Sequence, residues 1–297
     1  MARIAIVGVG AIGSVVGAAL LDARRHDVTL CAHRTTFERL IIRNHGKVVT
    51  IPARPLLDPK VAHPVEWLLL CTKAHQTASA AEWFRALAPK KIAVLQNGIE
   101  HVELVAPFAA GATILPVIVR CPVEPLAPGD VNQQGPAALT VQNNPIGAEF
   151  ATLFDASEVA VHSTDDFRTE AWLKLCQNAV NGAVCGLTVR TIIVMRDPLV
   201  ADFARKLALE CIAVARAEGA KLDDSLAEKI VAQMANIPDA EHHGNSLYYD
   251  RRAGRPLEFE ARNGVVVRLA RKHGIATPLA DAAYALLSGA SGTACAN

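Results

Sequence analysis

The sequence lacks the features that direct a protein toward nucleic acids or membranes. Its formal net charge is only +1 over 297 residues, and it has no basic run with interleaved aromatic residues, so we expect no nucleic acid partner. No apolar run approaches the roughly 18 residues of a membrane-spanning helix, and no basic-then-apolar leader precedes the first predicted strand. We therefore expect a cytoplasmic protein with no membrane partner, whose ligands are small molecules.

The cysteines lack any C-x-x-C spacing, and their number is odd. Seven are present: Cys31, Cys71, Cys121, Cys176, Cys185, Cys211 and Cys295. We expect most of them to be reduced residues of the core, with neither disulfides nor zinc. The adjacent His242 and His243 offer the alternative of a metal, but adjacent side chains diverge and no array of carboxylates and histidines surrounds them. We predict no metal site.

The first residues combine an apolar run with a glycine-rich turn, in which Gly8, Gly10 and Gly13 form a G-x-G-x-x-G motif. In a dinucleotide-binding turn the first glycine allows the sharp turn, the second admits the pyrophosphate, and the third lets helix and strand pack closely. A helix that starts at Ala11 and Ile12 would point its unpaired N–H groups at that pyrophosphate. The alternative is a tight turn without a ligand.

The second predicted strand, residues 27–32, indicates which nicotinamide cofactor fits. An acidic residue at its carboxyl end would accept hydrogen bonds from the ribose of NAD, but the chain continues with His33 and Arg34. The guanidinium of Arg34 can pair with a 2′-phosphate, which favours NADP. The alternative is that Arg34 is a solvated loop charge.

Two more polar residues follow predicted buried strands. Lys73 comes after the strand at 65–71, and Asn97 comes after the strand at 90–95. Residues just past the carboxyl ends of parallel strands line the ligand crevice of an open α/β sheet, so both are candidate ligand contacts. The alternative for Asn97 is that it forms a common Asn-Gly turn.

The remaining pattern predicts an α/β domain followed by a helical one. With 51% hydrophobic and 20% charged residues, the chain can bury a large core and favours two domains over one. In the first part we predict a helix at 37–44, a strand at 48–51, a helix at 77–87, antiparallel segments within 112–142, a helix at 146–154 and a strand at 158–162. Further helices are predicted at 167–188, 198–218, 225–236 and 257–273. The expected domains are a Rossmann-type dinucleotide-binding domain at 1–165 and an all-helical substrate domain at 166–297.

The first helix of the second domain carries two polar residues among apolar ones. Lys174 and Asn178 are four residues apart and share a helix face. A lysine in such surroundings is costly unless it is paired or used; the alternative is a lysine that extends to the rim of a core helix. Further along, Glu258 has the spacing of a surface ion pair with Arg262, and pattern alone does not separate that pair from catalysis.

Several short motifs together resemble one family. They are Gly8 to Gly13, Arg34, Thr72-Lys73-Ala74, Leu95 to Gly98, Trp172 to Asn178, and Ser246 through Glu258 to Asn263-Gly264. On these residues the chain resembles the ketopantoate reductase family, NADPH-dependent enzymes of pantothenate synthesis, over essentially its whole length. The resemblance implies reduction of a 2-keto acid to a 2-hydroxy acid, first of all 2-dehydropantoate to pantoate.

The same resemblance implies a role for each candidate residue. Lys174 is then the general acid, and Glu258 stands with it in the catalytic set and helps to bind the substrate. Asn97 and Asn178 hold substrate and cofactor, and Ser246 contacts the substrate. The implied NADPH-binding residues are Gly8, Gly10, Ala11, Ile12, Gly13, Arg34, Lys73 and Asn97.

The sequence departs from the family pattern on the substrate side. The family often has a second asparagine four residues after the first, where this chain has Gly182, and His243 stands where another asparagine is expected. A β-hydroxyacid dehydrogenase is an alternative, although the glycine-rich segment usual before its lysine is absent before Lys174. A non-catalytic NADP-binding sensor is a second alternative. A homodimer remains open.

Overall fold

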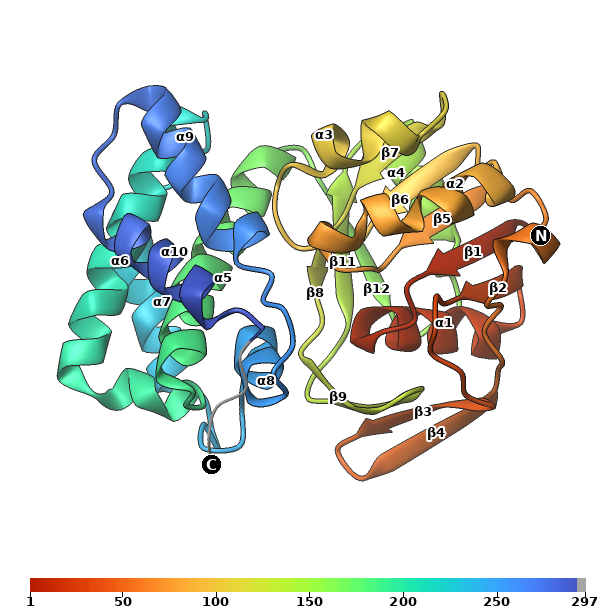
Figure 1. Ribbon diagram of the computed structural model, residues 1–297, viewed down its shortest axis with the longest axis horizontal. Coiled ribbons are helices and arrows are strands. Elements are labelled where there is room, and N and C mark those ends of the chain that lie inside the picture. The colour runs from red at the N-terminus through yellow and green to blue at the C-terminus, as the bar shows by residue number, and fades with distance from the viewer. Residues whose placement is uncertain (293–297) are drawn as a thin grey trace. The chain divides into compact units, whose positions relative to one another are not determined.

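The computed structural model describes residues 1–292 and divides into two units, Met1–Phe167 and the residues from Arg168 onward. Figure 1 shows strands in the first unit and helices alone in the described part of the second. The predicted fold class, a Rossmann-type α/β domain followed by a helical domain, is confirmed.

A five-stranded parallel sheet forms the centre of the first unit. Its strands, in spatial order, are β2 (Asp27–Cys31), β1 (Arg3–Val7), β5 (Trp67–Leu70), β6 (Lys91–Val94) and β7 (Thr113–Pro116). Side chains alternate between two buried cores: Ile4 and Ile6 enter one, and Ala5 and Val7 enter the other. Burial on both faces explains the continuous apolar runs of these strands.

Helices cover both faces of this sheet. They are α1 (Ala11–Ala23), α2 (Ala81–Leu87), α3 (His101–Val105) and α4 (Pro145–Thr152). Residues of α1 and α4 pack in the core that contains Ile4, and residues of α2 and α3 pack in the opposite core. Trp67 of β5 meets Phe150 of α4 with ring centroids 5.6 Å apart. The sheet is thus packed between two hydrophobic cores, one on each face.

Two smaller sheets complete the first unit. One has the order β4 (Lys47–Pro52), β3 (Arg39–Asn44), β10 (Asp130–Gln133), β9 (Val123–Ala127), and the other has the order β12 (Ala160–Thr164), β11 (Ala138–Gln142), β8 (Ile118–Arg120). Antiparallel pairing within 112–142 is confirmed for β9 with β10 and β8 with β11, but β7 pairs parallel with β6. The strand predicted at 158–162 lies two residues further on.

The helix predicted at 37–44 is wrong, because residues 39–44 form β3. Leu40 and Ile42 of this strand are buried, and β3 pairs with β4 through a two-residue turn. His45 and Gly46 of that turn have φ values of 44° and 83°, the left-handed conformation of a hairpin turn whose twist suits antiparallel strands. The strand predicted at 48–51 is confirmed as β4.

The second unit is built from helices over its described residues. They are α5 (Phe167–Thr188), α6 (Pro198–Ala217), α7 (Ser225–Ala235), α8 (Ser246–Arg252), α9 (Val265–His273) and α10 (Pro278–Ala290). The first three predicted helices are confirmed within two residues. The fourth, predicted at 257–273, instead begins with a π-helical turn, Glu260–Gly264, that leads into α9. The sequence pattern did not predict α8 and α10.

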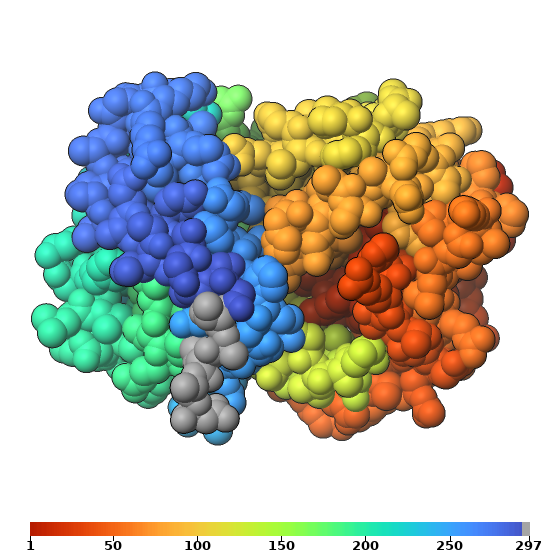
Figure 2. Space-filling model, viewed as in Figure 1, coloured from red at the N-terminus to blue at the C-terminus, as the bar shows by residue number. Residues whose placement is uncertain are grey.

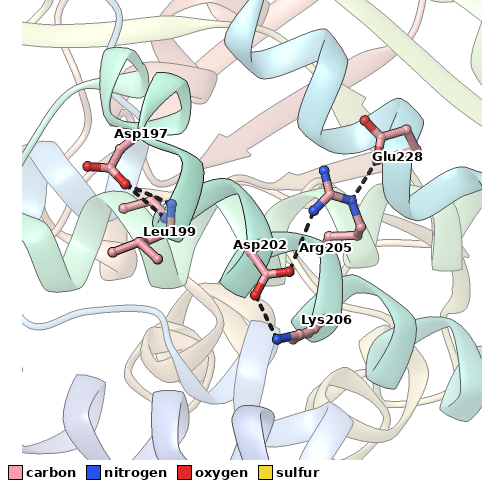
Figure 3. A network of polar contacts seen from close by, with 7 residues as sticks. Asp197, Leu199, Asp202, Arg205, Lys206 and Glu228 are labelled. Carbon is pink, nitrogen blue, oxygen red and sulfur yellow. Dashed lines mark hydrogen bonds and ion pairs between the residues drawn. The ribbon is translucent and has the colours of Figure 1, made fainter.

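Polar contacts on the surface of α6 include one ion pair to α7 (Figure 3). Asp197 caps α6 by accepting from the backbone N–H of Leu199 at 2.9 Å. Arg205 pairs with Glu228 of α7 at 2.6 Å, and Lys206 pairs with Asp202 at 2.6 Å. These charges are exposed, and such pairs contribute about 0.2–1 kcal/mol each, so the buried apolar residues of the helices supply most of the stability.

The six cysteines of the described residues are free thiols. Four of them, Cys31, Cys176, Cys185 and Cys211, are buried, which confirms the expectation of reduced core residues. Burial raises the pKa of the Cys31 thiol to about 12, so this thiol stays protonated at neutral pH and is a poor nucleophile. Cys295 lies outside the described residues.

Candidate functional site

The glycines of the first turn have different surroundings. Gly8 has a φ of +97°, and a Cβ there would lie 2.6 Å from the backbone nitrogen of Thr72. A Cβ on Gly13 would lie 2.1 Å from the carbonyl oxygen of Gly8. No atom lies within 4 Å of the corresponding position at Gly10. Packing therefore requires Gly8 and Gly13, whereas Gly10 leaves open space in which a ligand can approach the backbone.

The amino end of α1 is suited to an anion. Gly10 caps the helix without a side-chain hydrogen bond, and the first turn, which includes Ala11 and Ile12, has no acidic residue. The first N–H groups of a helix have no partner within it and carry the positive end of its dipole. The open space at Gly10 and this helix end fit the pyrophosphate of a dinucleotide.

A hollow lies beside the glycine turn at the carboxyl ends of β1, β2 and β5. It is lined by Val7, Gly8, Cys31, Ala32, His33, Thr72, Ser79, Ala80 and Trp83. Figure 2 shows the surface recessed next to the dark red amino-terminal segment. The exposed Arg34 directly follows His33 at the margin of the hollow. The loop that contributes His33 to the hollow therefore also carries the guanidinium of Arg34, next to a ribose that binds there.

The buried side chain of Gln96 joins the two loops that carry Lys73 and Asn97. Its nitrogen donates to the hydroxyls of Thr72 and Thr77, each at 3.0 Å. The same nitrogen lies 3.3 Å from the carbonyl oxygen of Lys73. Lys73 and Asn97 are both half-buried at this edge of the sheet. The structure thus brings them together with the glycine turn, through a residue that the analysis of the sequence did not single out.

Gln96→Leu should therefore affect stability and cofactor binding together. We expect the free energy of unfolding to fall by about 1–3 kcal/mol, because the hydroxyls of Thr72 and Thr77 lose a buried partner. If the glycine turn binds a dinucleotide, the affinity for that dinucleotide should also fall, because the Lys73 loop loses its contact with Gln96. Urea unfolding measures the first effect, and fluorescence titrations with nicotinamide dinucleotides measure the second. Gln142→Leu, which removes only a 3.3 Å bond to the backbone of Asp165, is the control; equal effects of the two substitutions would remove Gln96 from this role.

One face of α5 carries the second group of predicted residues. Lys174, Asn178 and Gly182 follow one another at intervals of four, so they lie along one face of the helix. Lys174 and Asn178 are half-buried, and Gly182 is buried. The ammonium group of a lysine is ordinarily charged at neutral pH. This face therefore presents a cation and an amide one helical turn apart.

Ser246 starts α8 and is held close to this face. The preceding residue, Asn245, caps α8 by accepting from the backbone N–H of Tyr248 at 2.9 Å. The side-chain nitrogen of Asn245 also donates to the backbone carbonyl of Asn181 in α5 at 2.7 Å. One asparagine thus both starts α8 and docks it onto α5, next to Gly182.

Glu258 and Arg262 form a buried pair, whereas the sequence suggested a surface pair as the alternative to catalysis. Their side chains are 3% and 5% exposed, and Arg262 Nη2 lies 3.8 Å from Glu258 Oε2. Arg262 Nη2 also donates to Ser246 Oγ at 2.7 Å. The neighbouring Asn263 donates to the carbonyl of Ala179 in α5 at 3.1 Å. The π-helical turn therefore directs two consecutive residues inward, and Arg262 is a site residue that the sequence analysis missed.

The predicted site residues thus form two groups, one in each unit. The first unit holds Gly8, Gly10, Gly13, Lys73 and Asn97 around the carboxyl edge of the sheet, with Arg34 exposed after β2. The second unit holds Lys174, Asn178, Ser246 and Glu258, with Arg262 linking the last two.

Comparison with known proteins identifies the family. The model of "Ketopantoate reductase PanE/ApbA" matches residues 4–145, and the model of its C-terminal part matches residues 166–291. The chain belongs to the ketopantoate reductase family. It is 40% identical to a 2-dehydropantoate 2-reductase of Mycobacterium tuberculosis over 97% of both chains. It is 39% identical to that of Caulobacter vibrioides over 98% of this chain and 100% of the relative.

Solved structures agree with this membership. The crystal structure of 2-dehydropantoate 2-reductase from Geobacter metallireducens superposes with a TM-score of 0.89 at 25% identity, covering 97% of this chain and 100% of that one. The chain is therefore an oxidoreductase of this family. Among residues 1–292, no helix is both long and apolar enough to cross a membrane. In the same part of the chain, no group of three histidine, cysteine, aspartate or glutamate side chains is placed to hold a metal ion.

Proposed function

We propose that this chain reduces 2-dehydropantoate to pantoate with NADPH as its cofactor. The observation that carries the proposal is the 40% identity, over 97% of both chains, to a protein named 2-dehydropantoate 2-reductase. The geometry of each unit supports it, because one offers a dinucleotide turn with open space at Gly10 and the other offers a lysine and an asparagine on one helix face.

The residues of the first unit fit a dinucleotide. Gly8, Gly10 and Gly13 shape the turn, and the N–H groups of Ala11 and Ile12 face the pyrophosphate in the proposal. Lys73 and Asn97, placed by Gln96, extend the site along the sheet edge. When bound, NADPH supplies the hydride that reduces the keto carbon.

The residues of the second unit supply the proton. The oxygen of a ketone gains negative charge as its carbon is reduced, and it needs a proton or a cationic partner within hydrogen-bond reach. Lys174 is the proposed proton donor. Asn178, one turn further along the same face, is proposed to hold the substrate and the cofactor. Ser246 is proposed to contact the substrate, and Glu258 to help bind it. Both units are therefore required for turnover.

Arg34 is proposed to select NADPH over NADH by pairing with the 2′-phosphate. Arg34→Ala should weaken NADPH binding by about tenfold or more, since a charge-assisted hydrogen bond contributes about 1.5–3 kcal/mol, and should change NADH binding little. Titration of the variant with both cofactors measures the difference. Arg25→Ala, which removes an exposed charge before the start of β2, is the control. Equal losses for both cofactors would remove Arg34 from the phosphate site.

The activity itself is tested by the consumption of NADPH with a panel of acids. We expect 2-dehydropantoate to be reduced with the highest kcat/KM, ahead of other 2-keto acids, and pantoate to be the product. Oxidation of 3-hydroxy acids with NADP instead would favour a β-hydroxyacid dehydrogenase. Binding of NADPH without turnover of any acid would favour a non-catalytic sensor.

A further inference from the structure

We propose that Arg262 is a further substrate-binding residue and that its guanidinium, together with the hydroxyl of Ser246, binds the carboxylate of the 2-keto acid. This inference rests on the proposed function, because it assigns one end of the substrate of that reaction. The guanidinium is buried, and its Nε has no hydrogen-bond partner in the protein.

The guanidinium of Arg262 is buried without enough protein acceptors. It has five N–H donors, and the residue is only 4% exposed. One donor bonds to Ser246 Oγ at 2.7 Å. Nε is buried and has no partner, and Glu258 Oε2, at 3.8 Å, is beyond hydrogen-bond distance. A buried polar group without its partner costs about 1–3 kcal/mol, and more when it is charged, so an anionic ligand would be bound favourably here.

Its position places it on the candidate site rather than elsewhere in the helical core. A Cβ on Gly182 would lie 3.6 Å from Nη1 and 3.7 Å from Cδ of Arg262. Because Gly182 has no side chain, the arginine packs directly against α5, on the face that carries Lys174 and Asn178. Asn263 fixes the π-helical turn to the same helix through the carbonyl of Ala179. The guanidinium is thus anchored from two sides.

The charges around Arg262 leave room for one more negative group. Burial lowers the pKa of Arg262, and the nearby carboxylates of Glu258 and Asp250 counter only part of this effect. Asp250 is already bonded to Arg255 at 2.9 Å. The two arginines and the two carboxylates therefore have a formal net charge of zero. Lys174 adds one positive charge, which the single negative charge of a 2-keto acid would balance.

Ser246 completes the set of donors. Its oxygen accepts from Arg262, so its own proton is available to an acceptor. A guanidinium N–H and a hydroxyl close together match the two oxygens of a carboxylate. Besides its proposed action on the substrate, Glu258 balances the charge of Arg262, because the two side chains form a buried pair at 3.8 Å.

The test compares the 2-keto acid with its primary amide, which keeps the keto group and removes the negative charge. In the wild type we expect kcat/KM for the acid to exceed that for the amide, and Arg262→Gln should reduce this ratio by about 10- to 150-fold, the range of charge-assisted hydrogen bonds. Arg262→Lys, which keeps the charge but loses the planar fork, should retain an intermediate ratio. Arg268→Gln, which removes an exposed arginine paired with Glu260 at 2.9 Å, is the matched control and should leave the ratio unchanged.

The outcomes separate this inference from the proposed function. Arg262 is merely structural if Arg262→Gln lowers kcat/KM for acid and amide by the same factor, because then the ratio does not move. Should Arg262→Gln fail to fold, an Arg262→Lys enzyme with the wild-type ratio would overturn the assignment equally. A wild type that reduces no 2-keto acid would instead overturn the proposed function.

Discussion

Lys174→Ala should lower kcat by about 10²- to 10⁴-fold, the usual contribution of general acid catalysis. The substitution removes the proposed proton donor and leaves the glycine turn of the first unit untouched, so NADPH affinity should stay within about twofold of wild type. The side chain is half-buried on a helix whose neighbours Trp172, Leu175 and Cys176 are buried, and alanine is a good helix former. Loss of the fold is therefore not expected.

Single-turnover and steady-state kinetics with saturating 2-dehydropantoate measure this effect. Lys206→Ala, which removes an exposed lysine paired with Asp202 in α6 (Figure 3), is the control and should keep the wild-type rate. A kcat for Lys174→Ala close to that of the control would exclude Lys174 as the acid.

The second large effect separates two glycines of the same motif. Gly13→Ala should destabilise the first unit by about 3 kcal/mol or more, because the new Cβ would lie 2.1 Å from a backbone oxygen that cannot move aside without shifting the turn. Gly10→Ala should leave stability within about 0.5 kcal/mol of wild type. Its φ of −84° suits any residue, and its Cβ would meet no atom.

Gly10→Ala, which should leave stability unchanged, should instead lower the affinity for the cofactor. If the pyrophosphate approaches the backbone at Gly10, Gly10→Ala should weaken NADPH by at least about tenfold, or 1.4 kcal/mol, in a fully folded protein. Thermal unfolding and an NADPH titration of both variants give the two values. Unchanged NADPH affinity in Gly10→Ala would mean that the open space at this glycine is not where the cofactor binds.

The sequence was sufficient for the parallel sheet because the signal there is local. The apolar runs at 4–7 and 67–70 are each buried on both faces. The stretch 37–44 has no such signal: Phe37, Leu40 and Ile41 also fit the spacing of a helix. Pairing of Ile42 with Val131 of β10, far along the chain, decides for a strand, and no pattern within 37–44 contains that information.

In the candidate site, too, local sequence patterns predict some residues, whereas contacts between distant segments determine others. Lys174 and Asn178 can be found from a helical period, and Gly8 to Gly13 from a motif. Arg262 cannot, because its burial depends on the missing side chain of Gly182 in another helix and on a π-helical turn that shifts the helical period. From spacing alone, Glu258 and Arg262 fit an exposed pair equally well. Departures from the family pattern, such as Gly182, were the available signal that this part of the site is organised differently.

The central claim is that this chain reduces the keto carbon of 2-dehydropantoate directly with the hydride of bound NADPH. The measurement that tests it most directly is mass spectrometry of the product formed by the wild type from NADPH deuterated at both C4 positions. We expect pantoate with one deuterium at C2. Pantoate without deuterium, or no pantoate from an enzyme saturated with NADPH, would contradict it.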